Sequence, residues 1–349
     1  MAFDKPVVVI DNGSYILKAG FACDNHPVSM FRNVVGRPNY LHGSYGKEYY
    51  DVHIGDEAVA KIEDLELSRP VVNGRIVHWD NMERVWHHVF YRELKAAPED
   101  RAVILACAAT TPIKEKIKCC EVFFETLNSP GLCVQSQSVL SLYGSGFTTG
   151  ISVDLGHDTA DIVPVYEGGL MSFAHMQTHY ASVDISKFLL DSFEERGINL
   201  RFRSEDVLDG IKKQLYLTQD IAMSRKDYHR TYKLPDGTDL DISLEAFMAA
   251  EMMINPELVK GYKTEVMALQ EAIVTCAMKC DAELRAELFD AVVPCGGVAM
   301  IPVLSSPEAY AVAWLGGATF AGMPDSKKMW VSKKQYEDYG EKIVRNKFM

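Results

Sequence analysis

The chain has 349 residues, of which 48% are hydrophobic and 24% are charged, so it can bury a sizeable core and its length favours two or more compact units. Its formal net charge of −12 argues against broad binding to nucleic acid or to anionic membranes, because phosphate groups are held by an excess of Lys and Arg. We therefore expect no nucleic-acid and no membrane partner, and the partners should be proteins or small ligands.

The cysteines and the first residues argue against two further classes of protein. The eight cysteines contain no CxxC pair and share no spacing with histidines, which disfavours a disulfide framework or a zinc site. Residues 1–5 lead into an apolar run without the features of a secretion signal, and no apolar stretch is long enough to span a membrane. We expect a soluble protein of the cytosol or the nucleus.

The first element expected in the chain is a buried strand that leads into a hairpin. Residues 7–10 are β-branched and apolar, and they end at Asp11-Asn12-Gly13-Ser14, which is a turn signature. A second run of this kind ends at Asp154-Leu155-Gly156 and is followed by a strand-like segment over residues 161–166. This internal repeat predicts an α/β protein with two duplicated lobes that face each other.

Helices are expected between and after these strands, and Asp80, Ser182 and Ser204 are their candidate N-caps. The predicted helices cover residues 80–90, 112–127, 182–197 and 204–215. Residues 234–238 have the composition of a turn between two short strands. No low-complexity linker separates the lobes, so we expect a packed hinge between them.

The first turn contains the groups that a phosphate and a metal ion require. Asp11 can hold Mg²⁺ directly or through water, and the backbone N–H groups of residues 12–14 can approach phosphate oxygens because little side chain intervenes. Lys18 on the returning strand adds a cation. Alone this hairpin is a weak signal, since Asn-Gly turns are common, but its repetition at residues 154–156 favours a clamp for a nucleoside triphosphate.

A third candidate is the glycine pair Gly296-Gly297, which follows the apolar residues 291–293. The absence of side chains lets the backbone pass close to a flat base or a ribose. A plain strand-ending turn explains the pair equally well, so both interpretations stay open here.

Segments over nearly the whole chain are similar to those of one family and occur in the same order. They are residues 9–14, 18–22, 35–38, 55–58, 79–83, 86–88, 139–143, 148–150, 163–168 and 329–336. On these segments the chain resembles the actin family. Such collinear similarity separates it from the sugar kinases and chaperones that share only the two hairpins.

The resemblance implies an actin-like α/β fold, which is a duplicated RNase H-like fold with two lobes and four subdomains around a central nucleotide cleft. Subdomain 1 would comprise residues 1–32, 70–144 and 312–349, and subdomain 2 would comprise residues 33–69. Subdomain 3, which is shortened, would comprise residues 145–180 and 265–311, and subdomain 4 would comprise residues 181–264.

The resemblance also implies ATP or ADP with Mg²⁺ or Ca²⁺ in the cleft. The implied nucleotide-binding residues are Asp11, Asn12, Gly13, Ser14, Lys18, Asp154, Gly156, Lys212, Gly296, Gly297 and Met300. Asp11 and Asp154 would hold the metal through water. Gln137 matches the residue that positions the attacking water in this family.

The second hairpin departs from the family pattern. Asp158 replaces a glycine whose backbone faces the terminal phosphates, and Asp161 replaces a histidine that helps to orient the water. A carboxylate about 4 Å from one phosphate charge costs roughly 4 kcal/mol at an effective dielectric constant near 20. Three further replacements lie around the base: Lys213 stands where the family has an acidic ribose contact, Ile301 where it has an aromatic residue, and Tyr310 where it has a lysine. We therefore expect weak or absent hydrolysis, and two alternatives stay open for the nucleotide itself: that it is bound weakly, or that its binding has been lost.

Two further segments bear on assembly. A helix and a strand that the family has after Met300 are missing, and residues 247–263 depart from the family's hydrophobic plug, so an ordinary filament is not expected. Tyr143, Gly146 and Thr148 keep part of the cleft by which actins bind helices of partner proteins. The alternative is that these three residues only hold the hinge.

The expected function is that of an actin-related structural or regulatory protein in a cytoskeletal or nuclear assembly. Its location would be the cytoplasm and the cytoskeleton, with the nucleus as a further compartment, and its partners would include actin or other actin-related proteins. The alternative is an active Mg-ATP-hydrolysing actin-like protein that forms filaments, in which Asp158 takes part in metal binding.

Overall fold

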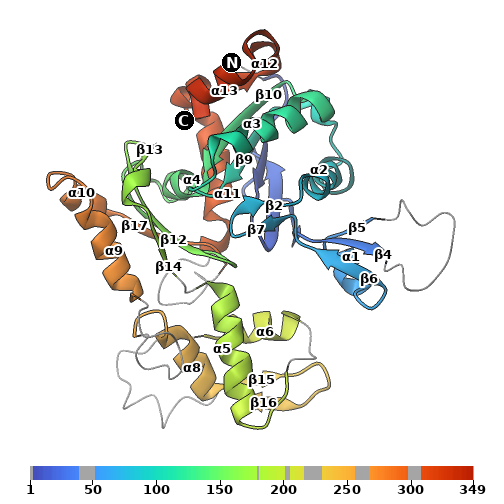
Figure 1. Cartoon of the computed structure of the whole chain (residues 1–349), viewed down its shortest axis with the longest axis vertical. Coiled ribbons are helices and arrows are strands. Elements are labelled where there is room, and N and C mark those ends of the chain that lie inside the picture. Colours follow the sequence, from blue (N-terminus) through green and yellow to red (C-terminus); the bar gives the residue numbers. More distant parts are fainter. Residues whose placement is uncertain are drawn as a thin grey trace. The chain divides into compact units, whose positions relative to one another are not determined.

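The computed structural model describes residues 3–38, 52–178, 181–200, 205–215, 230–255, 267–297 and 308–348. By its internal contacts the chain divides into two compact units. Unit 1 comprises Met1–Thr148, Glu167–Leu170 and Ala311–Met349, and unit 2 comprises Thr149–Tyr166 and Met171–Tyr310. Each unit combines segments that are far apart in the sequence, as the colours of Figure 1 show, and each is described by itself.

Unit 1 is built on a mixed sheet. Its strands are β1 (Val8–Asp11), β2 (Ile16–Phe21), β3 (Ser29–Arg32), β9 (Val103–Cys107), β10 (Gly131–Ser136) and β18 (Val331–Ser332), in the spatial order β18-β10-β9-β1-β2-β3. Strand β1 is parallel to β9 and antiparallel to β2, which places Asp11 opposite Lys18. The expected first strand and hairpin are therefore confirmed. The strand is a continuous apolar run because both of its faces are buried.

The helices of unit 1 supply the remaining apolar surface. They are α1 (Asp56–Ala60), α2 (Trp79–His88), α3 (Ile113–Glu121), α4 (Gln137–Gly144), α11 (Val312–Gly322), α12 (Lys333–Tyr339) and α13 (Glu341–Phe348). The chain continues from α2 and α3 into π-helical segments at Val89–Glu93 and Val122–Thr126. Trp86, Phe90 and Phe123 are fully buried in the resulting core.

Short strands complete unit 1. They are β4 (Val35–Pro38), β5 (His53–Ile54) and β6 (Leu65–Ser68) in one sheet, β7 (Val71–Val72) and β8 (Arg75–Ile76) in another, and β13 (Gly169–Leu170).

Helix α2 begins earlier than the sequence predicts, and Asp80 is not its cap. The helix starts at Trp79, and the preceding His78 makes no side-chain capping bond. Asp80 lies inside the first turn, where a negative charge is favourable next to the N-terminal end of the helix dipole. The predicted apolar stripe is confirmed, since Val85 and Phe90 are fully buried.

Helices α4 and α11 approach each other so closely that the contact requires glycine. A Cβ atom on Gly316 would overlap the carbonyl oxygen of Leu140, and a Cβ atom on Gly144 would overlap that of Val312. Only a residue without a side chain fits such a backbone contact. The contact fixes the helix that carries Gln137 as its first residue.

Unit 2 repeats the strand arrangement of unit 1. Its sheet contains β11 (Gly150–Leu155), β12 (Ala160–Tyr166), β14 (Met176–Thr178) and β17 (Val292–Cys295). Strand β11 is antiparallel to β12 and parallel to β17, as β1 is to β2 and β9. The internal repeat predicted from the sequence is thus present in the backbone pairing. A separate hairpin of β15 (Thr231–Lys233) and β16 (Asp239–Asp241) contains the expected turn.

The helices of unit 2 are α5 (Ser182–Glu195), α6 (Glu205–Lys212), α8 (Ser243–Glu251), α9 (Leu269–Met278) and α10 (Arg285–Asp290). The prediction that Ser182 caps α5 is wrong, because Ser182 is the first helical residue. The preceding Ala181 donates its N–H to the Asp184 carboxylate at 3.1 Å. The helix ends before Gly197, whose φ of 78° suits a helix-terminating glycine. Ser204 lies outside the described residues.

Candidate functional site

The first hairpin brings three of the predicted site residues together in unit 1. The Asp11 carboxylate accepts a bond from Lys18 Nζ at 2.7 Å through one oxygen and from Gln137 Nε2 at 2.6 Å through the other. Lys18 reaches Asp11 because the two residues are paired across β1 and β2, and Gln137 reaches it because α4 begins directly after β10. Asp11 is buried, so a neighbouring cation is needed to offset its desolvation.

The turn of the first hairpin is held by its own hydrogen bonds. The Asn12 amide donates to the Ala106 carbonyl at 3.2 Å, and the Gly13 amide donates to the Asp11 carbonyl at 3.0 Å. Among the described residues, no acceptor is found for the Ser14 amide, and no donor is found for the buried Oδ1 atom of Asn12. The phosphate-facing role predicted for all three amides is therefore best supported by the Ser14 amide.

Asn33 is a residue of this turn that the sequence does not indicate. It is 1% exposed and donates from Nδ2 to the Gly13 carbonyl at 2.9 Å. Gly13 itself cannot be replaced in this geometry, because a Cβ atom would overlap the carbonyl oxygen of Ile16. A polar residue between two strands is the only sequence signal for Asn33, and that pattern is too common to identify a role.

The second hairpin lies in unit 2 and closes through the bond from the Gly156 amide to the Thr159 carbonyl, at 3.0 Å. The side chain of Asp158 is 5% exposed, and one of its oxygens lies 3.9 Å from Nε2 of His157. The amide of Ser182, at the start of α5, donates to the Gly156 carbonyl at 3.0 Å. The turn is therefore fixed to the helix that follows it, with the Asp158 carboxylate largely removed from solvent.

Asp161 is engaged by three side chains of unit 2. Its carboxylate lies 2.6 Å from His175 Nε2, accepts from Thr159 Oγ1 at 2.8 Å, and accepts from Gln177 Nε2 at 3.3 Å. These contacts arise because Gln177 on β14 is paired directly with Asp161 on β12. Nothing in the sequence indicates His175 or Gln177 as members of this group.

The glycines after β17 join the second hairpin. Gly296 has a φ of 90°, and a Cβ atom there would lie 2.5 Å from both Asp154 Oδ1 and the Leu155 carbonyl. Next to it, a Cβ atom on Gly297 would have no heavy atom within 4 Å, so this backbone faces open space. Unit 2 thus brings Asp154 and Gly296 together, whereas Met300 lies outside the described residues.

Lys212 reaches the same part of unit 2 indirectly. Its ammonium donates to Ser182 Oγ at 2.8 Å and pairs with Asp209 at 2.7 Å. Because the backbone of Ser182 also binds Gly156, Lys212 is connected to the second hairpin through a single residue. Of the departures near the base, Ile301 is also among the residues that are not described.

The charged groups fit the phosphate end of a nucleotide better in the first hairpin than in the second. In the described part of the chain, no group of three or more His, Cys, Asp or Glu side chains is arranged to hold a metal ion. Mg²⁺ commonly keeps several waters and takes only one or two carboxylates, so the role predicted for Asp11 and for Asp154 does not require such a group in either unit. Lys18 supplies a cation in the first hairpin, whereas the second contains Asp158.

The residues predicted to bind partner helices lie in unit 1. The ring of Tyr143 stacks on that of Phe320, with centroids 5.7 Å apart, and burial raises the pKa of the Tyr143 phenol. Gly146 has a φ of 85°, and the Thr148 carbonyl accepts from the Gly168 amide at 2.8 Å. These contacts are compatible with both the partner-binding and the hinge interpretation.

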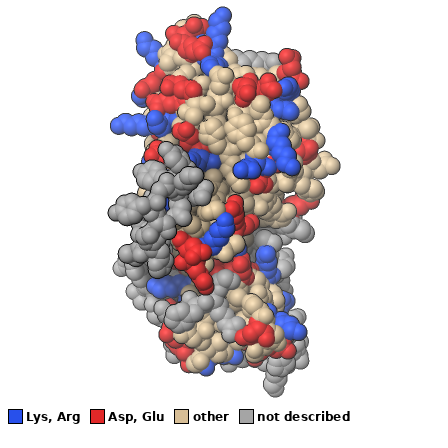
Figure 2. Space-filling view, turned by 90° about the vertical axis from the view of Figure 1, so that its right-hand side faces the viewer, with Lys and Arg blue, Asp and Glu red and all other residues tan. Residues whose placement is uncertain are grey.

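On the face drawn in Figure 2, Lys and Arg side chains are interspersed with Asp and Glu. None of the described helices combines the length and the hydropathy needed to span a bilayer.

Comparison with known families agrees with the duplicated strand arrangement and with the two hairpins. The family model described as Actin matches residues 3–306 and 303–349, which together extend over nearly the whole chain. The chain therefore belongs to the actin family.

Proposed function

We propose that the chain is an actin-related structural or regulatory subunit of a cytoskeletal or nuclear assembly, which binds ATP or ADP but hydrolyses ATP weakly or not at all. Proteins of this family generally bind a nucleotide with a divalent metal ion, and they commonly bind other proteins. The single observation that carries the proposal is the engagement of Asp161 by Thr159, His175 and Gln177.

The contacts of Asp161 support weak hydrolysis for a specific reason. The resemblance places a water-orienting histidine at this position, and a carboxylate cannot supply the N–H donor that an imidazole offers. His175, the imidazole nearest to Asp161, has its Nε2 atom 2.6 Å from the carboxylate. That nitrogen is therefore occupied by its contact with Asp161 within unit 2 and is not available to orient a water molecule.

The first hairpin supports the binding half of the proposal. Lys18 and Asp11 retain the cation and the carboxylate expected for phosphate and hydrated metal, and Gln137 lies within hydrogen-bond distance of Asp11. In the second hairpin, Asp158 adds a carboxylate that would repel phosphate by roughly 4 kcal/mol at about 4 Å and an effective dielectric constant near 20. We expect the balance to permit binding at reduced affinity, with Asp11, Asp154 and Gly296 among the contacting residues.

The family match supports the shortened third subdomain that we propose as part of the four-subdomain division. The match consists of two segments that meet at residues 303–306, close to the place where the family's helix and strand are expected to be missing. A shortened subdomain at a filament contact favours the role of a subunit in a larger complex over self-assembly. We propose the cytoplasm or the nucleus as the location of that complex.

The experiment that tests this function measures binding and turnover on the same preparation of the full chain. The nucleotide that co-purifies with the protein is identified, and phosphate release is then followed after addition of Mg-ATP. We expect bound adenine nucleotide and phosphate release near the rate without protein, unchanged in Gln137→Ala. Magnesium-dependent phosphate release that Gln137→Ala abolishes would instead establish the alternative, an active actin-like ATPase.

A further inference from the structure

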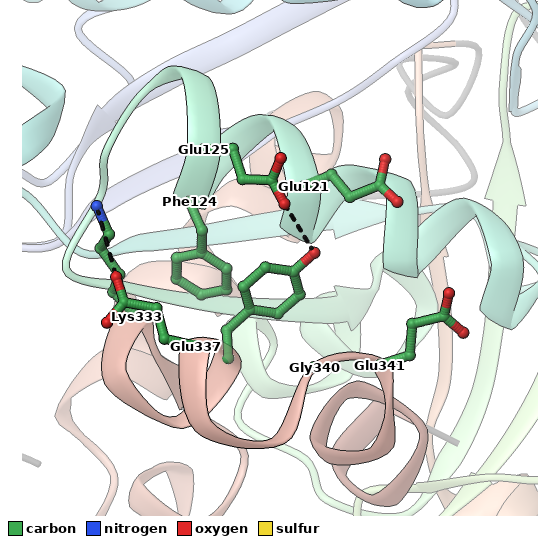
Figure 3. Close-up of a pocket in the computed structure, with 8 residues that line it drawn as sticks. Glu121, Phe124, Glu125, Lys333, Glu337, Gly340 and Glu341 are labelled. Atoms are coloured by element: carbon green, nitrogen blue, oxygen red, sulfur yellow. Dashed lines mark hydrogen bonds and ion pairs between the residues drawn. The ribbon is translucent and has the colours of Figure 1, made fainter.

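A pocket of unit 1, whose lining includes no residue of either hairpin, lies between the end of α3 with the π-helical segment that follows it and the two C-terminal helices. Its volume is about 520 Å³, and it is lined by residues of Val122–Thr126, of α12 and of the start of α13 (Figure 3). Five of its eight lining residues are charged. Pockets for small organic ligands are lined mostly by apolar side chains, so this composition favours a polar, charged occupant.

Two aromatic rings form the centre of the pocket. Phe124 and Tyr336 lie with their ring centroids 5.0 Å apart and their planes at 31°. Phe124 is buried, whereas Tyr336 is only partly buried, and both residues line the pocket. The face of such a ring attracts a cation and stacks favourably with a planar guanidinium group.

Four glutamates surround the rings, and Glu125 differs from the other three. Glu121, Glu337 and Glu341 pair with Lys118, Lys333 and Arg345 at 2.6, 4.0 and 2.9 Å, respectively. Glu125 instead accepts the hydroxyl of Tyr336 at 3.3 Å, which is a neutral donor (Figure 3). Glu125 is exposed, so its remaining acceptor positions are open to an incoming cation.

The existing ion pairs do not close the pocket to a further cation. Both partners of the pairs Lys118–Glu121 and Arg345–Glu341 are one-third or more exposed, and such pairs contribute little because water and salt screen them. Lys333 lies beside Glu337 and also donates to Asn128, so its ammonium is held at one side of the pocket. The pKa of Tyr336 is raised to about 12 by burial and by the carboxylates of Glu125 and Glu121, which agrees with a negative potential at the ring.

From this geometry we infer that the pocket is a docking site for an arginine side chain of a basic segment in a protein partner. The guanidinium stacks on the Tyr336 ring and donates to the Glu125 carboxylate, and Glu337 and Glu341 attract the flanking basic residues of the segment. Arginine is favoured over lysine because a planar fork of donors can bind a carboxylate and stack on a ring at the same time. The volume exceeds that of a single guanidinium, which leaves room for the adjoining peptide backbone.

The test uses the full chain, without added nucleotide, and a fluorescent peptide that has two arginines between glycines. Fluorescence anisotropy measures the binding of this peptide and of matched peptides with lysine or citrulline in place of arginine. We expect the arginine peptide to bind most tightly. Glu125→Gln should weaken its binding about tenfold, because a charge-assisted hydrogen bond becomes a neutral one.

Two control variants separate this site from general charge attraction. Glu287→Gln removes the same charge from an exposed position on α10 and should leave the affinity unchanged. Tyr336→Phe keeps the ring and should retain most of the affinity, whereas Tyr336→Ala should lose it, with thermal unfolding used to verify that each variant is folded. Equal losses in Glu125→Gln and Glu287→Gln, or equal binding of the arginine and lysine peptides, would overturn the assignment. Because no nucleotide is involved, the outcome is independent of the test of the proposed function.

Discussion

Asp158 introduces a carboxylate into the turn of the second hairpin, where the actin family has a glycine. Its side chain is 5% exposed and lies beside His157, so the charge is not dispersed in bulk water. Coulombic repulsion of a phosphate group is stronger in such a partly buried position than at an exposed one. Asp158 is therefore the residue whose replacement should change nucleotide affinity most directly.

We expect Asp158→Gly to tighten the binding of a fluorescent ATP analogue by at least about tenfold, because the variant removes a negative charge near the phosphates. The gain should shrink as magnesium rises, since the metal already neutralises part of the repulsion. Asp11→Ala should weaken binding, because it removes the carboxylate that Lys18 and Gln137 hold in place. Titrations at two magnesium concentrations measure both effects. Weaker binding by Asp158→Gly would show that Asp158 is a metal ligand.

Tyr336 provides a second residue-scale prediction, through its titration. Burial, and then the charges of Glu125 and Glu121, raise its pKa to about 12, so the folded state favours the neutral phenol. The stabilisation that this provides is fully present below the ordinary tyrosine pKa of about 10, and it is lost as the pH rises through the folded value. Tyrosinate absorbance should contain a late component near pH 12 that is absent in Tyr336→Phe, beside the late titration of Tyr143, whose pKa burial also raises. In Glu125→Gln the pKa of Tyr336 should fall, but it should stay above the ordinary tyrosine value because burial is the larger cause of the shift. An unchanged pKa would contradict the contact between Tyr336 and Glu125.

At the scale of elements, the close approach of α4 and α11 depends on the backbone rather than on side-chain packing. A methyl group on Gly316 has no free space, whereas one on Gly322, the last residue of the same helix, would meet no atom within 4 Å. The two glycines are therefore a matched pair in which the same substitution should have opposite effects.

Gly316→Ala should lower the free energy of unfolding by about 3 kcal/mol, because the helices must move apart to accept the methyl group. Gly322→Ala should raise it by about 0.5 kcal/mol, because alanine reduces the conformational freedom of the unfolded chain. Urea denaturation of both variants measures the two values. A Gly316→Ala protein as stable as the wild type would show that α4 and α11 separate without cost.

At the scale of the whole molecule, two units with the same strand pairing contain the two hairpins, one in each. The family match extends over both units as two segments that overlap at residues 303–306. The proposed loss of a helix and a strand at that point bears on the assembly of the protein with other subunits.

We expect the chain to stay in the supernatant when it is sedimented in polymerising salt with Mg-ATP, under conditions in which a conventional actin pellets. The reason is that the proposed loss of a segment at a lengthwise filament contact would remove part of the surface on which subunits associate. Regular filaments on electron microscopy grids would contradict this and would support the filament-forming alternative.

Much of the fold could be predicted from the sequence because the signals are local. The apolar run before Asp11, its repeat before Asp154 and the turn at residues 234–238 each fix a strand or a turn within a few residues. Helix starts were harder to place. Asp80 and Ser182 are both good capping residues, yet each lies inside its helix, because packing of the apolar stripe decides where the first turn begins.

The sequence by itself determined the family, the duplicated strands and the candidate hairpin residues, since these follow from short patterns and from their order along the chain. Only the tertiary structure decided the partners of those residues. His175 precedes β14 and reaches Asp161 because β14 pairs with β12. Asn33 reaches Gly13 between strands, and Tyr336 reaches Glu125 across 211 residues of sequence. Such contacts depend on sheet register and helix packing, which bring distant segments together, and local sequence preferences do not specify that approach.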